Sequence, residues 1–134
     1  MAKRSFPASV ESVPAARRFV AASLAGLPAD VTQRAQLLVS ELATNALLHA
    51  SGGFEVSAVY SARTQRLRVG VSDVGEGAPK LERPDTTQEH GRGVQLVAAI
   101  SDRWGVERHG RRPGKTVWFE LAARAPVMSD DGGL

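Results

Sequence analysis

The order of apolar and polar positions predicts two helices in the first third of the chain. Residues 12–28 read "SVPAARRFVAASLAGLP" and carry apolar side chains at helical spacing, and Ser12 offers an N-cap oxygen. A second helix is predicted over residues 30–50, where Asp30 and Gln33 have the spacing of a capping box. Both segments are long enough to form stable amphipathic helices against a sheet.

Four strands and a third helix follow. Residues 54–62 and 66–73 alternate apolar and polar positions, as antiparallel strands with one buried face do. Helical spacing returns over 93–102, and residues 103–109 and 115–123 predict a closing hairpin. Helices combined with mainly antiparallel strands in this order predict an α+β fold, a two-layer α/β sandwich.

Length and composition favour one domain. The chain has 134 residues, of which 43% are hydrophobic, so one packed core is expected. We expect the domain to span 1–124 and the patternless tail 125–134 to be disordered. There is no cysteine, which excludes thiolate metal sites and suits a reducing cytoplasm. No apolar run approaches the roughly 20 residues that span a bilayer, and no signal peptide is evident, so no membrane partner is expected.

The net charge of the chain does not point to a different class of protein. A net charge of +3 could favour nucleic acid, but no Lys/Arg-rich run occurs and aromatic residues make up 5% of the chain. We therefore expect no direct nucleic-acid binding.

Three hydrogen-bonding residues follow one another at four-residue spacing in "ELATNALLHA". Glu41, Asn45 and His49 fall on one face of the second predicted helix, among apolar neighbours. The face either points half-exposed into water or forms the wall of a pocket. In a pocket, the Asn45 oxygen suits Mg²⁺ and Glu41 could act as a general base. His49 could pack, cap the helix end or contact a ligand.

A second candidate is "SDVGEG", where Asp73 ends a predicted strand before Gly75 and Gly77. A carboxylate there can accept a hydrogen bond from an exocyclic amino group such as that of adenine, and glycines let the backbone approach a flat ligand. The alternative is an ordinary turn, in which aspartate and glycine are common.

The third candidate is "HGRGVQLV", in which Gly91, Arg92 and Gly93 precede a predicted helix. Such a turn presents backbone N–H groups and a positive helix end to a phosphate. It matches neither the dinucleotide fingerprint nor the Walker loop. The "GKT" at 114–116 enters a strand and is not interpreted as a phosphate loop.

Together, "ELATNALLHA", "DVGEG", "GRGVQLV" and "GKTVWFEL" resemble, in this order, the boxes of the GHKL family of ATPases and kinases. The small bacterial branch of anti-sigma-factor serine/threonine kinases is the most similar. The resemblance runs from the first helix to Leu121. It implies a Bergerat-type ATP-binding fold, with a mixed, mainly antiparallel sheet covered on one face by helices.

The resemblance also implies roles for single residues. Glu41 corresponds to the catalytic base, Asn45 to the Mg²⁺ ligand, and Asp73 to the carboxylate that reads the adenine amino group. Thr116 corresponds to a strand threonine near adenine, and residues 78–90 to the lid. The remaining positions implied to bind the nucleotide are His49, Gly75, Gly77, Gly91, Arg92, Gly93 and Val94; Val94 replaces a larger apolar residue usual in the family.

The function implied is that of a cytoplasmic regulator that binds ATP and Mg²⁺. As a protein serine/threonine kinase, it would hold a sigma factor, phosphorylate a small antagonist (anti-anti-sigma) protein and form a homodimer. The alternative is a nucleotide-binding module that sequesters its partner without turnover. The short lid, which carries few groups able to grip a γ-phosphate, favours this alternative.

Overall fold

A computed structural model describes residues 1–49, 52–73 and 95–124. In this part of the chain, one five-stranded antiparallel sheet has the strand order β1-β2-β3-β5-β4. The elements are β1 (Ala2–Phe6), α1 (Ser12–Ser23), α2 (Ala29–His49), β2 (Phe54–Ser61), β3 (Arg66–Asp73), β4 (Arg103–Arg108) and β5 (Lys115–Ala122). Residues 95–100 are also helical.

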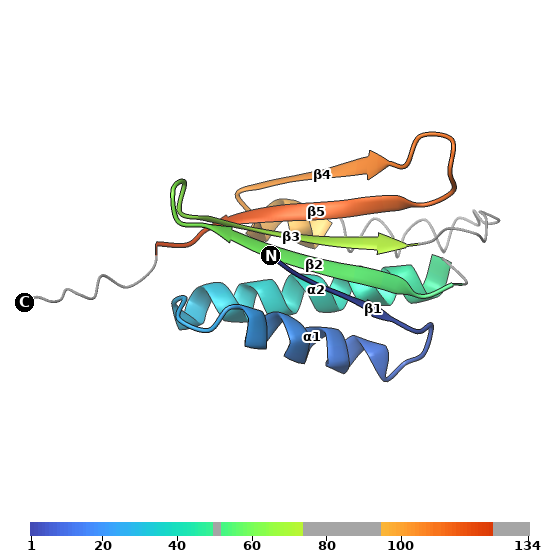
Figure 1. The fold of residues 1–134 in the computed structure, drawn as a ribbon, viewed down its shortest axis with the longest axis horizontal. Coiled ribbons are helices and arrows are strands. Elements are labelled where there is room, and N and C mark those ends of the chain that lie inside the picture. The colour runs from blue at the N-terminus through green and yellow to red at the C-terminus, as the bar shows by residue number, and fades with distance from the viewer. Residues whose placement is uncertain (50–51, 74–94, 125–134) are drawn as a thin grey trace, which may run out of the picture.

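Figure 1 shows α1 and α2 side by side on one face of this sheet. The arrangement is the predicted α+β two-layer sandwich, and all four predicted strands are present. The predicted long loop and the predicted tail lie outside the described residues. Among the helices that are described, none is long and apolar enough to cross a membrane.

The core lies between α2 and the inward face of the central strands. Alternate residues of β3 and β5 point toward the helices, because successive side chains of a strand face opposite sides. The largest fully buried side chains include Leu38 and Val39 of α2, Leu67 and Val69 of β3, and Phe119 and Leu121 of β5. Their burial removes apolar surface from water, which is the main favourable term in folding.

Both helix starts differ from the predictions. The Ser12 hydroxyl donates 2.7 Å to the carbonyl of Pro7, outside the helix, instead of capping α1. Asp30 lies inside the first turn of α2, where its carboxylate pairs with Arg34 at 3.3 Å. The capping predictions for these two residues are wrong, because α1 begins one residue and α2 two residues earlier than a cap at that position requires.

Strand β1 was not predicted. It pairs antiparallel with β2, from Ala2 opposite Ala58 to Phe6 opposite Phe54. Its middle residues are exposed, and Phe6 alone is buried, with its ring 5.4 Å from that of Phe54. The strand therefore lacks the alternation that marks a strand in sequence, as is common for short, charged edge strands.

Candidate functional site

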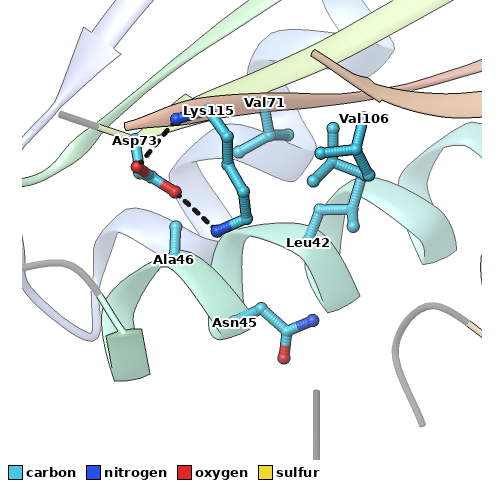
Figure 2. Close-up of a pocket in the computed structure, with 8 residues that line it drawn as sticks. Leu42, Asn45, Ala46, Val71, Asp73, Val106 and Lys115 are labelled. Carbon is cyan, nitrogen blue, oxygen red and sulfur yellow. Dashed lines mark hydrogen bonds and ion pairs between the residues drawn. The ribbon is translucent and has the colours of Figure 1, made fainter. Parts of the chain in front are cut away.

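A recess between α2 and the sheet is lined by residues from four elements (Figure 2). Its volume is about 470 Å³ with the open space at its mouth included, and the enclosed part is much smaller. The lining residues among those described are Leu42, Asn45 and Ala46 of α2, Val71 and Asp73 of β3, Val106 of β4, and Lys115 and Val117 of β5.

The fold brings two of the predicted site residues into this recess. Asn45 enters from α2, and Asp73 enters from the last position of β3. Figure 2 shows the Asn45 amide pointing away from Asp73. Asn45 itself is half-buried and lines the recess from the helix side.

The other predicted residues are not all placed beside these two. Glu41 is half-buried one turn before Asn45, and it is not among the described residues that line the recess. His49 is the last residue of α2, and its side chain lies outside the description. The predicted positions in the segments around the two glycine boxes also lie outside the described residues: Gly75, Gly77, Gly91, Arg92, Gly93 and Val94.

Within the described residues, Asp73 is held by Lys115 of the neighbouring strand β5. Its Oδ1 accepts a hydrogen bond of 3.3 Å from the backbone N–H of Lys115, and its Oδ2 lies 3.1 Å from Lys115 Nζ. The two side chains are 10% and 27% exposed, respectively. A carboxylate this deeply buried needs such partners, because the loss of hydration is otherwise uncompensated.

The sequence analysis missed Lys115. Its signal was present, because Lys115 alternates with Val117 and Phe119 along one strand and therefore shares their inward face. In "GKTVWFEL" the family resemblance points to Thr116, whereas the period of two along β5 points to Lys115.

Thr116 requires a correction. The resemblance implies a position near adenine, but its side chain lies on the opposite face of the sheet from the recess. Thr116 pairs in register with Ser72, and its Oγ1 is 2.6 Å from Ser72 Oγ and 3.0 Å from His109 Nε2. A shift of one residue along a strand reverses the face, so Lys115 lines the recess and Thr116 does not.

The recess suits a flat, partly polar ligand. Val71, Val106 and Val117 give its sheet side an apolar surface on which a ring system can lie. At one end, the Asp73 carboxylate can accept hydrogen bonds beyond those from Lys115, because two ionised oxygens offer about four acceptor positions.

The oxygen atoms that line the recess also fit a Mg²⁺ ion that is held mainly by the phosphates of a bound nucleotide. In the described segments, no three His, Cys, Asp or Glu side chains cluster as a metal cage. Mg²⁺ in phosphate-binding sites takes one or two protein oxygens and completes its shell with phosphates and water. The Asn45 amide oxygen, at the wall of the recess, could be one such ligand.

These features are those of a nucleotide-binding α/β sandwich. The family model for the histidine kinase-like ATPase domain matches residues 6–121 of the chain. The chain belongs to this family, and so is an ATP-binding domain of the GHKL type.

A similar solved structure is the crystal structure of full-length ShkA in complex with AMPPNP. It has a TM-score of 0.56 and 22% identity over 91% of this chain, and the similarity covers 32% of that chain. This likeness supports the fold alone. A comparison with curated proteins gives no match.

Proposed function

We propose that the chain is a regulatory protein serine/threonine kinase of the anti-sigma-factor type. The observation that carries this proposal is that Asn45 of α2 and Asp73 of β3 line one recess, with Glu41 one helical turn from Asn45. The ordered boxes of the sequence add the particular branch of the family. Family membership establishes ATP binding, whereas serine/threonine specificity and the regulatory role are proposals.

Each of the three residues has a chemical role in this proposal. Asp73 accepts a hydrogen bond from the purine amino group at the inner end of the recess. Asn45 contributes an amide oxygen to Mg²⁺, which, when bound, supplies positive charge against the phosphates during transfer. Glu41 accepts the proton of the attacking hydroxyl as a general base.

The proposed partners follow from the same branch. The kinase would hold a sigma factor and transfer phosphate to a serine or threonine of a small antagonist protein, as a homodimer in the cytoplasm. Phosphorylation adds about −1.5 to −2 charges at pH 7, enough to change how such an antagonist docks.

The test is transfer of labelled phosphate from ATP to the antagonist protein of the same operon. We expect label on one serine or threonine of the antagonist and a strong loss of label with Glu41→Gln. If the protein binds ATP yet labels no partner, the kinase proposal fails.

A second candidate is a nucleotide-binding module that sequesters its partner without turnover. One observation favours it: Glu41 does not line the recess within the described residues. This candidate predicts that Glu41→Ala keeps full regulatory activity in cells. Calorimetric titration with ATP, with and without Mg²⁺, shows whether nucleotide binding is retained by that variant.

A further inference from the structure

Strand β4 forms one edge of the sheet, and among the described residues it has a neighbouring strand only on its β5 side. Figure 1 shows it at the margin of the sheet beside β5. Five of its six residues are exposed. Two of them, Trp104 and Val106, are large and apolar and are 38% and 43% exposed. An edge strand that exposes apolar side chains is a template for pairing with another strand.

The pairing of β4 with β5 determines which backbone groups of β4 face the free edge. The N–H of His109 donates to the carbonyl of Gly114 at 3.4 Å, in line with the register of the two strands. In an antiparallel ladder, residues that bond to the partner strand alternate with residues whose N–H and C=O point away from it. Every second residue counted back from His109 therefore bonds toward β5. The residues between them, Trp104, Val106 and Arg108, direct their backbone groups to the free edge.

The side chains of this edge are self-complementary in one antiparallel register. With Gly105 opposite Gly105 of a second copy, Trp104 lies opposite Val106. Arg103 lies opposite Glu107 in the same register, and two-fold symmetry repeats both pairings. The backbone agrees, because Trp104 and Val106 both direct N–H and C=O outward and would exchange two hydrogen bonds. Apolar residues thus meet apolar residues, and opposite charges meet.

Both charged side chains of this register are accessible to a second copy. Arg103 is 62% exposed and lies 3.5 Å from Glu120. Glu107 is 64% exposed and lies 4.0 Å from Arg68. Ion pairs with such exposed members contribute little, so Arg103 and Glu107 can turn to a new partner at small cost. Opposite charges directly across an antiparallel pair stabilise it, and like charges destabilise it.

The other edge of the sheet, β1, provides a contrast. It carries Lys3 and Arg4 among its exposed middle residues and has no acidic residue. Antiparallel pairing of two copies of β1 would therefore leave its cations without opposite charges. Cationic edges of this kind are a common device against association. Of the two edges, only β4 has charges that match those of its own copy.

We propose that two copies of the chain associate through β4, antiparallel and centred on Gly105, so that their sheets become continuous. Val106 also lines the recess, so Trp104 of the second copy would lie beside the wall of the nucleotide site. The inference rests on the homodimer included in the proposed function and names its surface. It does not depend on phosphate transfer.

Two charge reversals test this surface by sedimentation equilibrium of the full chain. Wild-type protein should dimerise with a dissociation constant well below about 1 mM. Arg103→Glu and Glu107→Arg each place like charges opposite one another in both symmetry-related pairs, so each alone should dimerise about tenfold or more weakly. An equimolar mixture restores opposite charges in both pairs and should form mixed dimers with nearly the wild-type constant. Lys3→Glu, a reversal on the β1 edge, is the matched control and should keep the wild-type constant.

Cysteine substitutions test the register separately, because the chain has no cysteine of its own. Arg103 and Glu107 of the second copy would form a pair without backbone hydrogen bonds, with Cα atoms about 4.5 Å apart, a separation that a disulfide can span. A mixture of Arg103→Cys and Glu107→Cys should therefore cross-link on mild oxidation, as mass spectrometry shows. Either variant alone should not, because Arg103 would lie about 13 Å along the strand from Arg103 of the second copy.

Three results would overturn the proposal. One is wild-type protein that is monomeric at about 1 mM, which would leave the β4 edge to a strand of another protein. Another is wild-type association in both charge reversals, which would place the homodimer on a different surface. The third is cross-linking of each cysteine variant alone as readily as of the mixture. Restored mixed dimers without phosphate transfer to any partner would remove the kinase proposal alone.

Discussion

Asn45 and Asp73 line the same recess from opposite sides, one from near the C-terminal end of α2 and the other from the end of a central strand. The recess thus has a neutral oxygen donor on the helix wall and an anionic acceptor on the sheet wall. A nucleotide lying between them would place its base and its phosphates in different chemical surroundings. The four predictions below test this arrangement and the fold that holds it.

Removal of the Asn45 amide should reduce the effect of Mg²⁺ on ATP binding. In Asn45→Ala, we expect the gain in ATP affinity on adding Mg²⁺ to fall about tenfold or more. Mutation of residues that only contact a metal's ligands already lowers metal affinity by about this factor, so loss of a direct ligand should do at least as much. Stability should change by only about 0.5 kcal/mol, because Asn45 is half-buried. Titrations with and without Mg²⁺ measure the effect, and Thr44→Ala, exposed on the same helix, is the control. An undiminished Mg²⁺ effect in Asn45→Ala would exclude the metal role.

Glu41→Gln should separate catalysis from binding. A general base contributes about 10²–10⁴-fold, so phosphate transfer should fall by at least about 100-fold while the ATP dissociation constant changes little. Single-turnover transfer and calorimetry measure the two quantities separately. Glu55→Gln is the control, because Glu55 lies on β2 with its side chain on the sheet face away from the helices. Unchanged transfer in Glu41→Gln would favour a different proton acceptor.

Thr116→Ala tests the corrected position of that threonine. The substitution breaks the hydrogen bonds that join Thr116 to Ser72 and His109, so we expect a loss of about 1 kcal/mol in the free energy of unfolding. The ATP dissociation constant should stay within about twofold of the wild-type value, because the side chain does not reach the recess. Urea unfolding and calorimetry give both numbers. A large loss of ATP affinity would place the threonine at the base after all.

Gly105→Ala should destabilise the edge of the sheet beside the recess. A Cβ at Gly105 would lie 2.7–2.9 Å from ring atoms of Trp118, closer than van der Waals contact allows. The Trp118 ring also has the Arg68 guanidinium 4.0 Å from its centroid, which restricts its movement. We expect a loss of about 1–3 kcal/mol, typical of overpacking.

The matched background for this substitution is Trp118→Ala. With the ring removed, Gly105→Ala should cost much less, so the two changes should be non-additive in urea unfolding. Equal costs in both backgrounds would mean that the ring contact is not the cause.

Much of the fold follows from local patterns. Alternation along 54–61, 66–73 and 115–122 identified β2, β3 and β5, because each strand buries one face against the helices. The pattern failed for β1, where one buried residue, Phe6, carries the packing and the strand forms only because β2 offers an unpaired edge. The hydrogen bonds that stabilise β1 are with distant residues and leave no local signal.

The sequence by itself determined the chemistry available to the site: an amide and a carboxylate on a helix, and an aspartate at a strand end before glycines. Tertiary structure alone decided which of these groups meet. It brought Asn45 and Asp73 to one recess, turned Thr116 to the opposite face and placed the Lys115 ammonium on Asp73. The reason is that register and strand order bring together residues far apart in the chain. In addition, neighbouring residues of a strand point to opposite faces of the sheet, so a shift of one position moves a side chain from the helix-covered face to the other.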